Sequence, residues 1–335
     1  MLKVAINGFG RIGRAFYKAA INKNAKFKVV AVNDLTDPEN LAYLLKYDSV
    51  YGNWHNHRVS ATKTSISVDG NKIPIFSEKE PDKLPWQKLK VDVVVESTGF
   101  FTKKEGASLH LKAGAKRVII SAPTKSEDIN TYVIGVNDKK LKKSEKIISN
   151  ASCTTNCIAP VVAVLNNKFG IKKALMTTIH SYTSTQNIID GPSQKDVRRG
   201  RAAAENLVPT TTGAAIATTL TIPVLKNKFD GMAIRVPTPC GSMIDVTAVL
   251  KKKVTAEQVN KAFIDAEKNP LYKGVIQVAK DPLVLKDIVG SSYSAIVETQ
   301  FTNVIGGDLV KVLAWYDNEY GYSCRLVEMV EKLKA

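Results

Sequence analysis

Cys153 stands where a protein chain can generate a reactive thiolate. A strand-like run at residues 145–149 precedes it, and an apolar, helix-compatible stretch at residues 158–166 follows it. These flanks predict a helix that begins at Cys153. The N–H groups and the positive dipole end of a helix N-terminus favour an anion, so we expect a thiol pKa below the ordinary value of about 8.5. The thiolate is the attacking form of cysteine.

Other interpretations of the cysteines have to be weighed. Free cysteine is among the residue types most often buried, so Cys153 on its own is as readily a small core residue. A disulfide or metal site built on Cys153 and Cys157 is not favoured, because the sequence lacks a second ligand pair and Cys240 and Cys324 are isolated. Four cysteines in 335 residues indicate a reducing compartment.

His180 is the histidine that fits a thiol nucleophile. It ends a strand-like segment downstream of Cys153 and is followed by polar residues up to Thr183. An imidazole within hydrogen-bond reach stabilises a thiolate and moves protons, whereas the alternative is a satisfied structural histidine. The other three histidines are expected at the surface, His55 and His57 in a polar loop and His110 in a helix.

Arginines and threonines of the second half indicate an anion site. Arg235 ends a strand-like segment, and three further arginines cluster at residues 198–201. Guanidinium groups together with threonine hydroxyls and backbone N–H groups make good phosphate receptors. The hydroxyls in question are those of Thr154, Thr183 and residues 210–212. Taken alone, the arginine cluster is better explained by a subunit contact or a solvated face.

A glycine-rich turn near the N-terminus predicts a dinucleotide site. Gly8, Gly10 and Gly13 follow a strand at residues 4–7 and precede a helix at residues 15–21. The first glycine permits the turn, the second lets the backbone approach a pyrophosphate, and the third lets helix and strand pack closely. About twenty residues later a second strand ends at Asp34, whose carboxylate suits a ribose hydroxyl and repels a 2′-phosphate. The pattern therefore favours NAD over NADP.

The elements around these motifs predict two domains. Parallel-type strands at residues 91–97 and 117–121 end next to Thr98 and at Ser121, and residues 65–76 have the pattern of a hairpin around Asp69-Gly70. After Cys153 longer alternating strands at 173–182, 231–236 and 242–250 accompany a helix at 255–268. We expect an α/β Rossmann domain at 1–151, an α+β catalytic domain with an antiparallel or mixed sheet at 152–318, and a final helix at 319–335 that packs back on the first domain.

Composition limits the possible partners. The formal charge is +17, with 39 scattered lysines against nine arginines. Scattered lysine confers solubility, and clustered arginine with exposed aromatics, the usual sign of a specific nucleic-acid surface, is absent from the sequence. No apolar run reaches the length of a membrane span and no signal-type region is evident, so we expect a cytoplasmic protein that binds neither membrane nor specific nucleic acid.

Six motifs in order resemble phosphorylating glyceraldehyde-3-phosphate dehydrogenases. They are residues Gly8–Gly13, Ser149–Asn156, His180–Thr183, Pro209–Ala215, Arg235–Pro239 and Trp315–Glu319. The resemblance runs from Val4 to the final helix. It implies oxidation of glyceraldehyde 3-phosphate by NAD and attack by inorganic phosphate, giving 1,3-bisphosphoglycerate through a thiohemiacetal and a thioester on Cys153. It also implies a homotetramer.

The resemblance assigns roles to the residues of these motifs. Cys153 is the nucleophile and His180 accepts the proton. Thr183 and Arg235 are expected to hold the substrate phosphate, and Arg199 could serve either phosphate site. The attacking phosphate is assigned to Ser152, Thr154, Thr212 and Gly213. Asn318 is expected to orient the nicotinamide carboxamide, while the cofactor set also includes Gly8, Gly10, Arg11, Ile12, Gly13, Asp34, Thr98 and Ser121.

Three alternatives remain at this point. Erythrose-4-phosphate dehydrogenase shares the fold and the thiol chemistry, and the two aldehydes have to be compared directly. Aspartate-semialdehyde dehydrogenase has the same layout, but it gives no reason for the NAD-type Asp34 or for the threonine cluster. A basic nucleic-acid or surface-binding protein would bind tightly and selectively even in salt, whereas a generic polycation loses affinity as salt is added.

Overall fold

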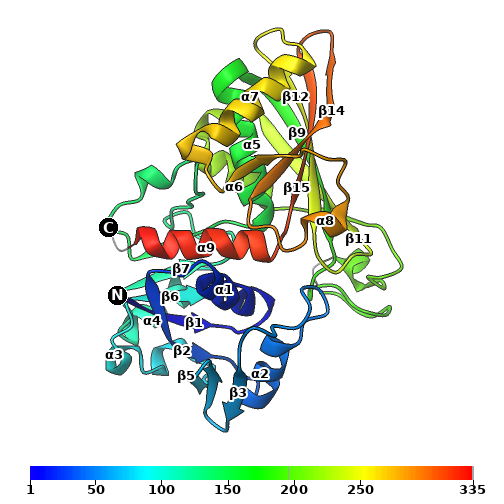
Figure 1. The fold of residues 1–335 in the computed structure, drawn as a ribbon. Helices are drawn as coiled ribbons and strands as arrows, with labels where there is room; N and C mark the ends of the chain where they lie inside the picture. The colour runs from blue at the N-terminus through cyan, green and yellow to red at the C-terminus, as the bar shows by residue number, and fades with distance from the viewer. Residues whose placement is uncertain (195, 334–335) are drawn as a thin grey trace. The chain divides into compact units, whose positions relative to one another are not determined.

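A computed structural model describes residues 1–194 and 196–333 of the chain. It divides into two compact units (Figure 1). The first contains Met1–Tyr132, Lys140–Ala151 and the chain from Ser323 on, and the second contains Val133–Lys139 and Ser152–Tyr322.

The described part of the first unit forms one eight-stranded sheet. Its strand order is β3-β4-β5-β2-β1-β6-β7-β8, and the run from β5 to β8 is parallel. The strands are β1 (Leu2–Asn7), β2 (Phe27–Asn33), β3 (Val59–Thr62), β4 (Ser65–Val68), β5 (Asn71–Phe76), β6 (Val93–Glu96), β7 (Arg117–Ile120) and β8 (Ile147–Ser149). The helices are α1 (Arg11–Asn22), α2 (Pro38–Lys46), α3 (Trp86–Leu89), α4 (Lys104–Lys112) and α9 (Tyr320–Lys332), of which the first three residues of α9 count with the second unit.

The parallel strands of this sheet are covered on both faces. All four residues of β6 are buried, as is typical of a parallel strand between two layers of helices. Further apolar side chains of β1, β2 and β7 complete this core around Trp86, which is fully buried. The α/β Rossmann class expected from the glycine turn is confirmed.

The predicted hairpin is formed by β4 and β5. Asp69 and Gly70 both have positive φ, at 51° and 82°, and Val68 pairs with Asn71 across the turn. Two residues with φ above zero are what a tight turn of this length needs, and Asp-Gly satisfies that need. The hairpin ladder is antiparallel, and β5 then joins β2 in parallel.

The described part of the second unit forms a seven-stranded mixed sheet. Its order is β10-β11-β9-β12-β15-β14-β13, with parallel pairs at β9–β11 and β13–β14 and antiparallel pairs elsewhere. The strands are β9 (Ile171–Ser181), β10 (Val208–Thr211), β11 (Phe229–Val236), β12 (Ser242–Leu250), β13 (Ile276–Val278), β14 (Ala295–Ile305) and β15 (Leu309–Tyr316). The helices are α5 (Cys153–Phe169), α6 (Ala214–Thr221), α7 (Ala256–Lys268) and α8 (Leu285–Ile288).

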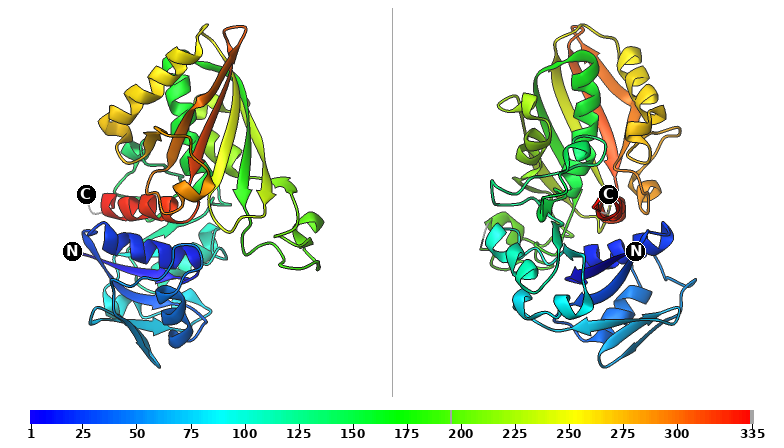
Figure 2. Two further views of the ribbon diagram at one scale, coloured as in Figure 1. Left: turned by 45° about the vertical axis from the view of Figure 1, so that its right-hand side comes forward. Right: turned by 90° about the vertical axis from the view of Figure 1, so that its left-hand side faces the viewer.

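Helices α5 and α7 lie on one side of this sheet, and the other side is open (Figure 2). The alternation of β9 follows this asymmetry, because Met176, Thr178 and His180 are buried whereas Leu175 is 67% exposed. A shift of one residue would turn His180 to the other face. The two-residue alternation of β9 thus places the side chain of His180 on the covered side of the sheet.

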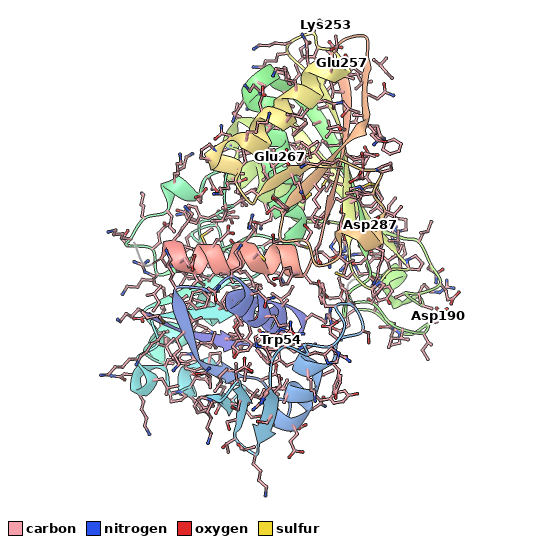
Figure 3. The ribbon with its side chains drawn as sticks, viewed as in Figure 1. Trp54, Asp190, Lys253, Glu257, Glu267 and Asp287 are labelled. Atoms are coloured by element: carbon pink, nitrogen blue, oxygen red, sulfur yellow. The ribbon has the colours of Figure 1, made fainter. Side chains whose placement is uncertain are left out.

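Short 3₁₀ turns lie among the segments that connect the helices and strands of the described residues. The turns are η1 (Pro81–Lys83), η2 (Asp138–Lys140), η3 (Val197–Gly200), η4 (Pro223–Leu225) and η5 (Pro270–Tyr272). Trp54, labelled in Figure 3, lies on the loop before β3 and packs against His57, with the rings tilted by 40° and their centroids 4.1 Å apart. No helix within residues 1–194 and 196–333 combines the length and the apolar character needed to cross a membrane.

The surface position expected for His110 is wrong. Its side chain is fully buried on α4, where it contacts Glu96 and Trp86. The charged residues that flank it along the sequence point away from the core, whereas His110 shares the buried face of the helix with Ala107. The position on the helix face, rather than the sequence neighbours, decides burial.

Candidate active site

Cys153 is the first residue of α5, as predicted. Ser152 caps the helix: its Oγ accepts from the backbone N–H of Thr155 at 3.0 Å, which satisfies one of the unpaired donors of the first turn. Ala151 has a φ of 56° and turns the chain sharply into this cap. The helix continues through Pro160 to Phe169, and Cys157 is buried one turn beyond Cys153. Local sequence therefore places the sulfur at a helix N-terminus.

Strand register brings the other reactive groups to the same place. Across four neighbouring strands Arg235 pairs with His180, His180 with Ser242, and Ser242 with Tyr316. Partners in a sheet ladder have their side chains on the same face, so these four residues form one row on the side of α5. The row includes Tyr316, which the sequence analysis had not assigned a role.

The sulfur of Cys153 faces the imidazole of His180. The distance from Sγ to Nε2 is 3.5 Å, and Oγ1 of Thr154 lies 4.0 Å from Sγ. On the far side of the ring, Nδ1 is 2.6 Å from Nη1 of Arg235 and 2.7 Å from the carbonyl oxygen of Ser181. A guanidinium only donates, so while Arg235 is in contact Nδ1 accepts and the ring proton is on Nε2, towards the sulfur.

The pKa expected for the Cys153 thiol is wrong for the chain by itself. Although the residue keeps part of its surface exposed, the protein around the sulfur raises the thiol pKa above its usual value. The charge of Arg235 and a hydrogen bond from Thr154 act in the opposite direction without overcoming burial. The desolvation of an anion at this position outweighs the helix N-terminus.

The imidazole of His180 is held in its neutral form. Burial, followed by the charge of Arg235, lowers its pKa to about 3. Burial likewise lowers the pKa of Arg235 from its usual value, with Arg199 contributing and the opposite charge of a Cys153 thiolate working against it. A neutral imidazole is the form that accepts a proton.

Tyr316 is a site residue that sequence reasoning missed. Its hydroxyl lies 2.8 Å from Oγ1 of Thr154 and 2.9 Å from Oγ1 of Thr178, and its ring stands edge-on to His180 at 6.0 Å. It therefore fixes the threonine beside the nucleophile. The signal that could have found it is its position inside the motif Trp315–Glu319.

The arginine cluster is divided by the structure. Arg198 pairs with Asp196, and Arg201 pairs with the exposed Asp190, which is labelled in Figure 3. Arg199 instead donates from Nε to Oγ1 of Thr210 at 3.0 Å, and its charge acts on Arg235. Two of the three arginines thus make local surface pairs, and Arg199 is the member near the catalytic row.

The remaining predicted phosphate ligands are partly exposed. Thr183 follows β9, and its Oγ1 lies 2.9 Å from that of Thr185. Oγ1 of Thr212 accepts from the N–H of Ala214, and a Cβ placed on Gly213 would meet nothing within 4 Å. The N-terminus of α6 is therefore open above Gly213.

Asn318 is fixed in orientation by three donors. Its Oδ1 accepts from the backbone N–H of Gly241 at 2.8 Å and from the hydroxyls of Ser181 and Ser242. Because all three groups donate to one atom, the amide oxygen is assigned to that side and the NH₂ group points the other way. The residue is 6% exposed and lies next to the strand ends that carry His180 and Ser242.

The glycine turn of the first unit fits a dinucleotide. Gly8 has a φ of 90°, and a Cβ there would lie 2.8 Å from the backbone nitrogen of Thr98. A Cβ on Gly13 would lie 2.1 Å from the carbonyl oxygen of Gly8, so helix and turn touch directly. A Cβ on Gly10 would meet nothing within 4 Å, which leaves open the space that a pyrophosphate needs over the N-terminus of α1.

The other predicted cofactor residues surround this turn. Asp34 accepts from the N–H of Phe9 at 2.7 Å and from that of Thr36, so its carboxylate is anchored at the turn. Arg11 and Ile12 begin α1, and the guanidinium of Arg11 pairs with Asp48 at 2.9 Å. Thr98 and Ser121 follow β6 and β7 at the carboxyl edge of the sheet. That edge is where nucleotides bind in such folds.

Comparisons with known proteins agree on one family. Residues 2–104 match the family model described as glyceraldehyde 3-phosphate dehydrogenase, NAD binding domain, and residues 152–318 match its C-terminal domain. A glyceraldehyde-3-phosphate dehydrogenase of Geobacillus stearothermophilus is 54% identical over 329 residues, covering 98% of this chain and 97% of the relative. Glyceraldehyde-3-phosphate dehydrogenase 1 of Bacillus subtilis is 53% identical with the same coverage. Glyceraldehyde-3-phosphate dehydrogenase 2 of Trichormus variabilis is 51% identical over 333 residues, 99% of this chain and 98% of the relative.

Proposed function

The chain belongs to the glyceraldehyde-3-phosphate dehydrogenase family, and from that premise we propose how its residues perform the reaction. It is an NAD-dependent enzyme that oxidises glyceraldehyde 3-phosphate and uses inorganic phosphate. The alternative of erythrose-4-phosphate dehydrogenase is not favoured, because the relatives above carry the name of the three-carbon activity. The 3.5 Å contact between Cys153 and His180 is the observation on which the proposed chemistry rests.

Cys153 is the nucleophile of this proposal. Its sulfur forms a bond to C1 of the aldehyde as the π bond of the carbonyl breaks, and the proton given up by the thiol ends on the carbonyl oxygen, which becomes the hydroxyl of a thiohemiacetal. The backbone N–H of Cys153, together with the Nε2–H of His180 that stands 3.5 Å from the sulfur, is assigned to stabilise the developing oxyanion. His180 then accepts the hydroxyl proton as C1 is oxidised to a thioester, and inorganic phosphate attacks C1 and expels the thiolate.

Arg235 links substrate binding to the protonation state of His180. For Nε2 to accept a proton, the ring proton has to move to Nδ1. The carbonyl oxygen of Ser181, 2.7 Å from Nδ1, can accept a hydrogen bond from that N–H. In the described structure Arg235 donates a hydrogen bond to Nδ1 and so keeps the proton off that atom. A phosphate that draws the guanidinium away frees Nδ1 for Ser181 and turns Nε2 into a base. The substrate phosphate is therefore assigned to Arg235 with Thr183, with Arg199 available to either phosphate.

The second phosphate and the cofactor complete the assignment. The attacking phosphate is assigned to Ser152, Thr154, Thr212 and Gly213, where hydroxyls and an open helix end are available. NAD, when bound, supplies the two-electron oxidant. The pyrophosphate of NAD would be held by Gly8, Gly10, Arg11, Ile12 and Gly13, and its ribose by Asp34. Asn318 would orient the nicotinamide carboxamide, and Thr98 and Ser121 complete the set of residues that contact the cofactor.

We also propose a homotetramer in the cytoplasm. The open face of the second sheet exposes large apolar side chains, including Leu175 at 67% and Met232 at 41%. Apolar surface of this kind on a sheet without covering helices suits contact with another copy. Cys153 and Cys157 are free thiols one helical turn apart, a state that a reducing compartment maintains.

An assay of NADH formation with and without inorganic phosphate tests the proposed chemistry. With phosphate, glyceraldehyde 3-phosphate should support continuous turnover. Without it, the thioester accumulates, and NADH should appear as a burst of about one equivalent per active site. Continuous turnover without phosphate would refute the phosphorolytic step. A higher kcat/KM for erythrose 4-phosphate than for glyceraldehyde 3-phosphate would refute the substrate assignment.

A further inference from the structure

Three polar residues end the three central strands of the first sheet in register. Asn33 is the last residue of β2, Asn7 of β1 and Glu96 of β6, and they pair as Asn33 with Asn7 and Asn7 with Glu96. All three are at most 5% exposed. In-register partners on parallel strands have their side chains on one face, so the three form a row at the carboxyl edge beneath the glycine turn.

The row is joined by short hydrogen bonds. Asn33 Nδ2 donates to Asn7 Oδ1 at 2.7 Å, and Asn7 Nδ2 donates to Glu96 Oε2 at 2.6 Å. His110 Nε2 reaches the same oxygen of Glu96 at 3.1 Å, and Trp86 Nε1 donates to His110 Nδ1 at 3.1 Å. The nitrogens of Asn7 and His110 stand 3.4 Å apart because both converge on Oε2.

Trp86 determines the charge state of this network. The indole N–H can only donate, so Nδ1 of His110 accepts and the neutral ring has its proton on Nε2. That proton is directed at Glu96, whose Oε2 therefore receives two donors. Its other oxygen, Oε1, receives the backbone N–H and the hydroxyl of Thr98. Four donors on two oxygens describe a carboxylate, since a carboxylic acid would need an acceptor for its own proton.

Glu96 is thus a buried anion beside a neutral histidine. An anion without an opposite charge is costly to bury, and an apolar residue would serve packing better. The carboxylate instead holds Thr98 through two hydrogen bonds, one from its backbone nitrogen, which is 2.8 Å from Oε1, and one from its hydroxyl. Thr98 in turn lies against Gly8, at which a Cβ would be 2.8 Å from the Thr98 nitrogen and 2.9 Å from its Cγ2.

The same contacts decide whether the hydroxyl of Thr98 can donate a hydrogen bond to a ligand or accept one from it. Its hydroxyl proton is donated to Glu96, and one lone pair accepts from the N–H of Phe100 at 3.1 Å. One lone pair is left, so Thr98 can only accept a hydrogen bond from a ligand. A ribose hydroxyl suits that requirement, whereas a pyrophosphate oxygen does not.

We propose that Glu96 is a positioning residue for NAD, which fixes both the place and the polarity of Thr98 against the glycine turn. The inference rests on the proposed placement of NAD at that turn. Glu96 touches neither the cofactor nor the reacting atoms, and it acts through Thr98. His110 and Trp86 keep its acceptor oxygens oriented.

The test is the dissociation constant of NAD for Glu96→Gln in the full chain, measured by calorimetry. In the glutamine variant an NH₂ group replaces one of the two carboxylate oxygens, and it cannot accept the hydrogen bonds that this oxygen now receives. Either Thr98 or Asn7 therefore loses its hydrogen bonds to residue 96. We expect the Kd for NAD and the KM for NAD to rise on the order of tenfold or more. The kcat at saturating NAD and the rate of Cys153 alkylation should be unchanged. Glu298→Gln, at a glutamate of β14 that is 2% exposed, is the matched control and should bind NAD normally.

Two variants of Thr98 show whether Glu96 acts through it. Thr98→Val keeps the shape but removes the hydroxyl, and Thr98→Ser keeps the hydroxyl. The valine variant should bind NAD more weakly, the serine variant should restore binding, and adding Glu96→Gln to Thr98→Val should weaken binding less than the two single effects predict.

The outcomes are distinguishable. A wild-type Kd in folded Glu96→Gln overturns this inference and leaves the proposed function intact, whereas failure of the unsubstituted protein to bind NAD overturns both. If Glu96→Gln does not fold, Thr98→Val decides, and a wild-type Kd in that variant overturns the inference. A lower melting temperature of Glu96→Gln together with a wild-type Kd would reveal a merely structural role and also overturn it.

Discussion

Replacing Arg235 by glutamine should slow the alkylation of Cys153 at neutral pH. The guanidinium is 2.6 Å from Nδ1 of His180, and Nε2 across the ring is 3.5 Å from the sulfur. Along that path the charge lies at most about 8 Å from the sulfur, where it stabilises a thiolate by roughly 0.5 kcal/mol at the dielectric constant of water and roughly 2 kcal/mol at an effective value of 20. Because about 1.4 kcal/mol corresponds to a factor of ten, the thiolate fraction should fall roughly 2- to 30-fold.

His180 does not cancel this loss. Removing Arg235 removes one of the two causes that lower the pKa of the imidazole, so the ring becomes more basic. Burial is the larger cause and remains in the variant, which keeps the pKa of the ring below its ordinary value. At pH 7 the ring therefore stays neutral, and no imidazolium replaces the lost charge beside the sulfur.

The assay is the rate of iodoacetamide alkylation of Cys153 between pH 6 and pH 9, in full-length protein without NAD or phosphate. Arg198→Gln is the matched control, since Arg198 is an exposed arginine that pairs with Asp196, and its rate should equal that of the unsubstituted protein. Arg235→Lys, which keeps a positive charge, should show an intermediate rate. If Arg235→Gln is alkylated as fast as the unsubstituted protein at every pH, the guanidinium does not support the thiolate and the reasoning is refuted.

Three further outcomes are expected. Cys153→Ser should abolish NADH formation and leave the Kd for NAD unchanged, and retained oxidation would reject the nucleophile. Asp34→Ala should raise kcat/KM for NADP relative to NAD, because a carboxylate that repels a 2′-phosphate is lost; an unchanged ratio would mean that another group contacts the ribose. The pKa of His180, lowered to about 3 in the folded chain, implies a stability contribution that is present above about pH 6.5 and lost as pH falls towards 3. Between pH 7 and pH 5, His180→Asn should accordingly lose about 2 kcal/mol less stability than the unsubstituted protein in urea unfolding, and equal losses would contradict the neutral, buried imidazole.

Local chemistry made several features predictable. The glycine turn, the Asp69-Gly70 hairpin and the start of α5 at Cys153 all depend on a few neighbouring residues whose backbone preferences are strong. The position of Asp34 was predictable for the same reason, because it directly follows a strand at a fixed spacing after the turn. In each case the signal and the structure lie within one or two elements.

Other features depend on which strands become neighbours and on how deeply a group is buried. The row from Arg235 through His180 to Tyr316 is set by the order of β11, β9, β12 and β15, which no local pattern contains. The thiol pKa followed burial rather than the helix N-terminus, since desolvation depends on every atom around the sulfur.

His110 shows the division between the two sources of information most directly. The sequence by itself determined that it is helical and that a strand at residues 91–97 ends next to Thr98. Only the tertiary structure decided that α4 buries His110 against Glu96 and Trp86, and that the last residues of β1, β2 and β6 align. Hydrogen-bond partners far apart in the chain are chosen by packing, because a donor or acceptor enclosed in the core has to be satisfied by whichever groups the fold brings to it.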